Sequence, residues 1–284
     1  MGEEAKHDHL ADIRDLIEAA DMPPEALPSD AFFSKSVDRE VSAAASGYEA
    51  EMTRLLGIQE ERERLFAEAE ATRPVATPER PLRIGVLLSG SGTNLQAIID
   101  RIADGTLSNV EISLVVSSRP SAKGLQRAEA AGLQTLTLSK EIYADPFAAD
   151  EVIASELKRC DTDYVIMAGY MRMVHAPLLA SFPNRVVNLH PALLPSFKGA
   201  HAIQDAFDRG VKVTGVTVHF ANEVYDQGPI IAQRALAVEE GWDVDTLEAH
   251  IHAIEHELYP EVISWLASGR VHVRENLTVA IDSE

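Results

Sequence analysis

From Leu82 onward, short apolar runs alternate with amphipathic stretches, and this alternation restricts the fold more than any other feature of the chain. The strand-like apolar runs are residues 84–88, 112–116, 135–138, 164–167, 186–189, 213–220 and 230–237. Apolar residues at helical spacing occupy 95–102, 123–131, 150–158 and a long final stretch, 246–267. Strands that alternate with helices predict an α/β fold with an open, mostly parallel sheet covered by helices on both faces.

The first 81 residues differ from the rest in charge and in pattern. They hold 19 of the 45 acidic residues and 9 of the 25 basic ones. Helical spacing over 10–20 and 37–56 predicts helices, and Pro74, Pro78 and Pro81 indicate a linker over 72–81. We therefore expect an acidic helical N-terminal extension that ends in a Pro-containing linker, residues 1–81, followed by a catalytic domain, residues 82–284.

Charge and cysteine content exclude several classes of partner and location. The formal net charge is −20 at pH 7, which makes nucleic acid and anionic membrane surfaces poor partners. The single cysteine, Cys160, cannot form an intrachain disulfide. The most apolar stretch, 164–182, is interrupted by Arg172, His175 and Pro177, and the N-terminus has no basic and apolar leader. We expect a cytoplasmic protein without a membrane span.

A polar loop with two glycines, Ser89-Gly90-Ser91-Gly92-Thr93-Asn94, joins the first strand to the first helix. Ligands of open parallel sheets bind at this edge, and free N–H groups at a helix start favour an anion such as phosphate. Thr93 and Asn94 can add side-chain donors. A dinucleotide site needs a third glycine where Leu95 stands, and a P-loop needs a lysine after the loop, so a small phosphomonoester remains. A tight turn without a ligand is the alternative.

The fifth strand places Asn188 and His190 on one face, because side chains alternate along a strand. An amide donor beside an imidazole suits acyl transfer, which needs oxyanion stabilisation and proton movement. Asp226, in the polar loop 222–229, could pair with His190 and raise its pKa, or it could only cap local backbone. His252 and His256 have a spacing that could bind a metal, but no cysteine or carboxylate motif accompanies them, so we expect no metal site.

Four segments together resemble the phosphoribosylglycinamide formyltransferases, which are folate-dependent enzymes. They are residues 90–94, 168–172, 188–195 and 226–229. The resemblance covers 82–284 and none of the preceding residues. It implies the formyltransferase-type fold and formyl transfer from 10-formyltetrahydrofolate to the amine of 5-phosphoribosylglycinamide, in de novo purine (IMP) biosynthesis. It also implies small-molecule substrates, no metal, and a monomer or homodimer.

The resemblance further implies a role for each matching residue. Asn188 and His190 would be catalytic, with Asp226 tuning His190. The substrate phosphate and ribose would be held by Gly92, Thr93, Asn94 and Glu255. The folate site would be formed by Met171, Arg172, Met173, Val174, Asn188, Asn222 and Asp226. Three positions depart from the family pattern: Ala192 replaces a serine, 145–151 lacks an arginine that meets the folate's glutamate tail, and His252 stands where lysine or glutamine is commoner.

Two related enzymes and one unrelated class are alternatives. A 10-formyltetrahydrofolate hydrolase shares the Asn, His and Asp set, but it lacks the glycine loop and has an N-terminal domain of alternating strands and helices. A methionyl-tRNA formyltransferase would need a further C-terminal domain and an RNA substrate that the acidic charge disfavours. A non-catalytic metabolite-binding or scaffold protein would not need Asn188, His190 and Asp226 together.

Overall fold

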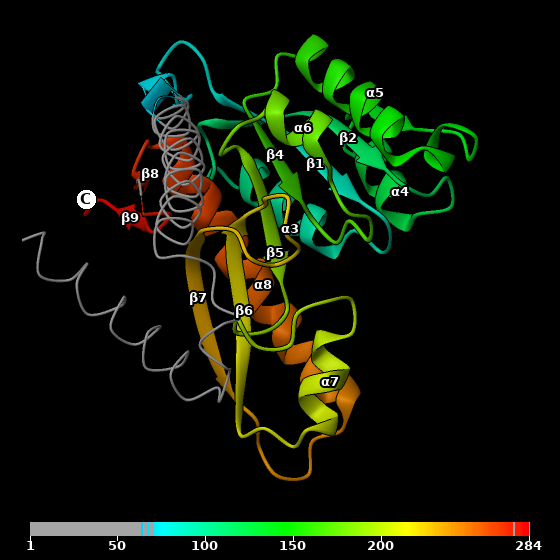
Figure 1. Cartoon of the computed structure of the whole chain (residues 1–284), viewed down its shortest axis with the longest axis vertical. Coiled ribbons are helices and arrows are strands. Elements are labelled where there is room, and N and C mark those ends of the chain that lie inside the picture. Colours follow the sequence, from blue (N-terminus) through cyan, green and yellow to red (C-terminus); the bar gives the residue numbers. More distant parts are fainter. Residues whose placement is uncertain (1–63, 65–66, 69–70, 275, 284) are drawn as a thin grey trace, which may run out of the picture. The chain divides into compact units, whose positions relative to one another are not determined.

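A seven-stranded sheet organises the described residues of the computed structural model, which are 64, 67–68, 71–274 and 276–283 (Figure 1). In spatial order its strands are β3 (Thr135–Thr137), β2 (Val110–Ser117), β1 (Leu82–Leu88), β4 (Tyr164–Met167), β5 (Val186–His190), β6 (Val213–Phe220) and β7 (Ile230–Ala237). The first five strands pair in parallel, and β6 and β7 pair antiparallel. The predicted, mostly parallel sheet is confirmed.

The order in which the strands are added to the sheet changes direction at β1, and a ligand site is expected at such a point. The chain passes from β1 to β2 on one side, and β4 pairs on the other side of β1. The loops that follow β1 and β4 therefore separate and leave a crevice at the carboxyl ends of the strands. The glycine loop and residues 168–174 are these two loops.

Helices cover both faces of the sheet, as predicted. One face packs against α3 (Thr93–Ala103), α4 (Lys123–Ala130) and α8 (Val244–Ala267), and the other against α5 (Pro146–Arg159) and α6 (Ala176–Ser181). Figure 1 shows α8 running along β6 and β7, with α7 (Ala202–Asp208) beside it. The strand β1 illustrates the two cores, because Ile84 and Val86 face α3 and α8 whereas Leu87 faces α5.

The start of α5 and the middle of α8 show how local chemistry places the helices. Asp145 caps α5 by accepting hydrogen bonds from the N–H groups of Phe147 and Ala148, and Pro146 occupies the first turn. In α8, the fully buried Tyr259 places its hydroxyl 2.9 Å from the carbonyl oxygen of Val187. This contact ties α8 to β5 one turn beyond Glu255, which reaches the crevice.

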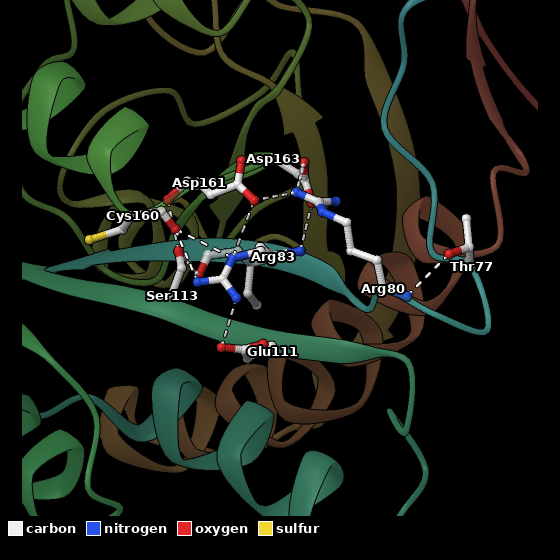
Figure 2. A network of polar contacts seen from close by, with 10 residues as sticks. Thr77, Arg80, Arg83, Glu111, Ser113, Cys160, Asp161 and Asp163 are labelled. Carbon is white, nitrogen blue, oxygen red and sulfur yellow. Dashed lines mark hydrogen bonds and ion pairs between the residues drawn. The ribbon is translucent and has the colours of Figure 1, made fainter.

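The segment 72–81, which the prolines predict to be a linker, is fastened to the α/β domain. Ala76 donates its N–H to the carbonyl of Ala267, and Arg73 donates to the carbonyl of Gly269. Arg80 binds both carboxylate oxygens of Asp163, at 2.8 and 3.0 Å (Figure 2). The prolines therefore interrupt helical structure without leaving the segment free of contacts.

Up to residue 63, the predicted helical extension lies outside the described residues. By its internal contacts the chain divides into Met1–Arg62 and Glu63–Glu284, and the described residues belong to the second unit. The domain boundary expected at residue 81 stays a prediction. The elements that were not anticipated are the helices α6 and α7, a C-terminal hairpin of β8 (Val271–Val273) and β9 (Val279–Ile281), and the short 3-10 helix η2 (Ile142–Ala144). In the part of the chain that is described, no helix has the length and apolar character to cross a membrane.

Replacing Arg80 with alanine should lower the free energy of unfolding by about 1–3 kcal/mol, the cost of removing hydrogen bonds from a charged partner. The Asp163 side chain is only 10% exposed and would keep just the N–H of Arg83. Urea denaturation of the full chain measures the change. Lys212→Ala is the control, because its ion pair with Glu240 is exposed and should matter by less than about 1 kcal/mol. Equal losses in the two variants would contradict a structural role for Arg80.

Candidate active site

The crevice at the carboxyl ends of β1, β4 and β5 contains a pocket of about 350 Å³. Seven residues predicted from the sequence line it: Gly92, Thr93, Asn94, Met171, Asn188, His190 and Glu255. They come from the glycine loop, the loop after β4, the end of β5 and the middle of α8. The fold thus gathers most of the predicted substrate-binding and catalytic residues at one place.

The glycine loop has a shape that only glycine allows at one position. Gly92 adopts φ +70°, and a Cβ there would lie 2.5 Å from the Cα of Gly124 in α4. Gly124 donates its N–H to the carbonyl of Gly90, and Arg127 donates Nε–H to the carbonyl of Ser91. No side chain caps the start of α3, and its first turn has no acidic residue. The free N–H groups of this helix start are suited to an anion.

Asn94 is tied to α8 through Glu255. Its Nδ2 donates to Glu255 Oε2 at 2.9 Å, and the same oxygen lies 2.9 Å from His252 Nδ1. Asn94 Oδ1 is buried and lacks a hydrogen-bond partner among the described residues. One of the two Nδ2 hydrogens of Asn94 is therefore engaged by Glu255, so the side chain keeps one donor for a phosphate, together with the backbone N–H.

His252 should titrate above the ordinary histidine pKa of about 6.5. Its hydrogen bond to Glu255 raises the pKa, and the charge of Glu248 adds to this. The folded protein then binds this proton more tightly than the unfolded chain, so the stabilisation is complete below about pH 6.5 and is lost as pH rises through the higher folded pKa. NMR titration checks this, with His256 as the internal control, because burial lowers its pKa. A pKa of His252 at or below that of His256 would contradict the assigned contacts.

Asn188 is held by a histidine that sequence analysis missed. Asn188 of β5 faces His219 across the antiparallel pair with β6, and Asn188 Nδ2 lies 3.1 Å from His219 Nε2. Burial lowers the pKa of His219, and its Nδ1 donates to the carbonyl of Phe220. Nε2 of neutral His219 is then the acceptor, so Asn188 keeps its second amide N–H for a ligand. Alternation along 213–220 could have indicated His219, but its partner depends on strand register.

His190 and Asp226 lie in contact, which is one of the two alternatives that the sequence left open for Asp226. His190 Nδ1 lies 3.5 Å from Asp226 Oδ2, and both side chains are almost fully buried. The other ring nitrogen, Nε2, is 2.7 Å from the carbonyl oxygen of Phe197 and must donate to it. Asp226 has a left-handed backbone, φ +52°, and its Oδ2 also accepts the N–H of Gly199. The imidazole is thus fixed between two acceptors at the wall of the pocket.

Most residues predicted to bind folate do not line this pocket. Arg172 lies over the ring of Tyr143, 4.0 Å from its centroid, and Val174 is buried. Met173 is exposed, and Asn222 accepts the N–H of Val224. Among the predicted folate residues, the pocket includes Met171 and Asn188, while Asp226 lies behind the lining residues His190 and Gly199, which it contacts. Tyr225, from the predicted polar loop 222–229, also lines the pocket, and so do Arg119, Ile203 and Glu248, which were not predicted.

A larger hollow of about 840 Å³ lies at the opposite, amino ends of β1 and β2. Its two arginines are already paired, Arg83 with Glu111 (Figure 2) and Arg159 with Glu156. It therefore offers no convergent set of free polar groups, and the smaller pocket is the candidate active site. In the described part of the chain, no three His, Cys, Asp or Glu side chains are grouped to hold a metal ion.

Comparison with known proteins agrees with this geometry. The formyl transferase family matches residues 82–263. The phosphoribosylglycinamide formyltransferase of Bacillus subtilis is 37% identical over 65% of this chain and 94% of that protein. The trifunctional purine biosynthetic protein adenosine-3 of Bos taurus is 40% identical over 68% of this chain, which spans only 19% of that relative's length.

A solved structure matches both in sequence and in fold. Glycinamide ribonucleotide transformylase 1 from Symbiobacterium toebii superimposes with a TM-score of 0.69 and 45% identity, over 72% of this chain and 95% of that one. The family match covers the end of β5 with Asn188 and His190, the loop between β6 and β7 with Asp226, and the part of α8 with Glu255. The chain therefore belongs to the formyl transferase family of enzymes.

Proposed function

We propose that this chain transfers the formyl group of 10-formyltetrahydrofolate to the amine of 5-phosphoribosylglycinamide in de novo purine biosynthesis. The observation that carries the proposal is a single pocket in which Asn188 and His190 lie beside a helix start suited to phosphate. Three relatives that carry this activity in their names are 33–37% identical and are covered over more than nine-tenths of their length.

The chemistry follows from the two polar groups at the end of β5. The neutral substrate amine attacks the formyl carbon, and the negative charge that develops on its oxygen is stabilised by the free amide N–H of Asn188 and by His190. A carbon–nitrogen bond forms to the substrate, and the bond from the formyl carbon to the folate nitrogen breaks. The amine loses a proton, and the departing folate nitrogen receives one with the help of His190. The electrons balance without a covalent enzyme intermediate, and no step uses a metal.

Asp226 and Phe197 define how His190 works in this scheme. The carboxylate 3.5 Å from Nδ1 orients the ring, so the proton available for transfer is the one on Nε2. That proton, on Nε2, is directed at the Phe197 carbonyl. Proton transfer to the substrate therefore requires a shift of the 197–199 turn, which also carries the Gly199 N–H that binds Asp226.

Substrate and folate occupy neighbouring parts of the crevice in this proposal. The backbone N–H groups of Gly92, Thr93 and Asn94 receive the phosphate, and Glu255 receives the ribose hydroxyls. Formylfolate lies against Met171 and extends toward Arg172, Met173, Val174 and Asn222. The segment 145–151 has no arginine, so in this proposal Arg172 supplies the cation near the glutamate tail instead.

The test is release of folate by the purified full chain. We expect tetrahydrofolate to appear when 10-formyltetrahydrofolate and 5-phosphoribosylglycinamide are both present, and not with either alone. Release from formylfolate alone would instead identify a hydrolase. No release under any condition, with both ligands bound, would favour the non-catalytic binding protein.

We also infer that the protein acts in the cytoplasm, where folate and phosphoribosyl intermediates are used, and that it is a monomer or homodimer. The bulk charge of −20 argues against nucleic acid as its substrate.

A further inference from the structure

We infer that Arg119 is the cation that binds the substrate phosphate and lets the site distinguish phosphorylated from unphosphorylated substrates. This inference rests on the proposed function. Arg119 was not among the residues predicted from the sequence, yet it lines the same pocket as the glycine loop and Glu255.

The end of β2 brings Arg119 to the glycine loop. Ser118 donates its N–H to the carbonyl of Leu88, and its hydroxyl lies 2.6 Å from the hydroxyl of Ser89. Ser117 fixes the backbone of Arg119 itself, because its hydroxyl bonds to both the N–H and the carbonyl of that residue. The Cα of Arg119 is thus held beside the start of the loop, while its side chain is exposed toward the pocket.

The negative side chains that line the pocket favour a cation beside a bound phosphate. Glu248 and Glu255 both line the pocket, and a phosphate dianion that enters it meets their negative charge. Among the described lining residues, Arg119 is the single lysine or arginine. His252 also faces the pocket, but its two ring nitrogens are within ion-pair range of these same glutamates.

Arg119 is also available, unlike the nearest arginine. Arg127 already donates to the carbonyl of Ser91 and to Gln96 Oε1, so it supports the loop from outside. Among the described residues, the Arg119 guanidinium has no ion pair or hydrogen bond. A planar guanidinium can donate two parallel hydrogen bonds to phosphate and also carries a full positive charge. Backbone N–H groups can donate hydrogen bonds to any anion, but they carry no full charge.

The test measures binding of 5-phosphoribosylglycinamide and of its dephosphorylated form by calorimetry, without folate, in the full chain. Arg119→Gln should weaken binding of the phosphorylated ligand about 10- to 100-fold, the range for a hydrogen bond to a charged group. Binding of the dephosphorylated ligand should change less than about 2-fold, because it makes no contact that the variant loses. Arg119→Lys should restore part of the affinity, since it returns the charge without the fork of donors.

Lys123→Gln is the matched control, because it removes one positive charge four residues away, on an exposed side chain outside the pocket. It should leave both affinities nearly unchanged. Equal losses in Arg119→Gln and Lys123→Gln would overturn the proposal in favour of a general charge effect, and so would unchanged binding in Arg119→Gln. No binding by the wild-type chain would contradict both proposals. Selective loss in Arg119→Gln, in a chain that transfers no formyl group, would overturn the proposed function alone.

Discussion

Replacing His190 with glutamine is expected to lower kcat at least about 100-fold, the usual scale for loss of an acid–base group. Glutamine can still donate to the Phe197 carbonyl, which His190 Nε2 contacts at 2.7 Å, so the local structure should survive. It cannot carry a positive charge or move a proton, so oxyanion stabilisation and protonation of the folate nitrogen are both weakened. Steady-state kinetics with both substrates measures the effect.

The control for this variant is His250→Gln, on an exposed part of α8 where the ring stacks on Trp242. That variant should keep kcat within about 2-fold of wild type, since it contacts neither ligand. Circular dichroism should show both variants folded. A folded His190→Gln enzyme with nearly wild-type kcat would remove His190 from the mechanism.

Replacing Asp226 with asparagine is expected to lower kcat by about 100-fold or more while both KM values stay close to wild type. The change removes the buried negative charge 3.5 Å from His190 Nδ1 but keeps an oxygen that can accept the Gly199 N–H. The ring then lacks the charged partner that orients it. Single-turnover kinetics separates this loss from slow product release.

Asp208→Asn is the matched control for charge, because Asp208 lies at the end of α7, outside the pocket, and bonds to Gln204. It should leave kcat nearly unchanged. If Asp226→Asn raised KM for both substrates and left kcat intact, Asp226 would act in holding the 197–199 turn and would have no part in proton transfer.

The long elements of this fold could be predicted from the sequence because each one buries a periodic apolar face. The runs at 84–88 and 164–167 are buried between helices on both faces, so they are continuous and apolar. The helices α6 and α7, of six and seven residues, contain too few turns to give a periodic signal. Their formation depends on tertiary contacts.

The residues of the candidate site likewise include some that the sequence could place and some that it could not. Asn188 and His190 could be placed on one face because strand alternation is local. His219 could not be assigned to Asn188, because that contact depends on the register of β5 against β6. Nor could the sequence show that the Asn94 side chain is engaged by Glu255, 161 positions away. Local sequence patterns therefore do not predict contacts between segments that are far apart in the chain.

The net charge of the whole chain does not describe the charge within the pocket. The value of −20 is a sum over the whole chain, whereas a phosphate responds to charges within roughly a Debye length, about 8–10 Å. Within that range the glycine loop, its helix start and Arg119 can bind an anion on a strongly acidic protein. The bulk figure therefore does not oppose an anionic substrate at this site.

The most direct test of formyl transfer follows the carbon itself. The full chain is supplied with 10-formyltetrahydrofolate labelled with ¹³C in the formyl group and with unlabelled 5-phosphoribosylglycinamide, and the products are analysed by mass spectrometry. The mechanism predicts that the label appears in an N-formyl derivative of the phosphoribosyl substrate, in step with release of tetrahydrofolate. Label recovered as free formate, or retained on the folate, would contradict it.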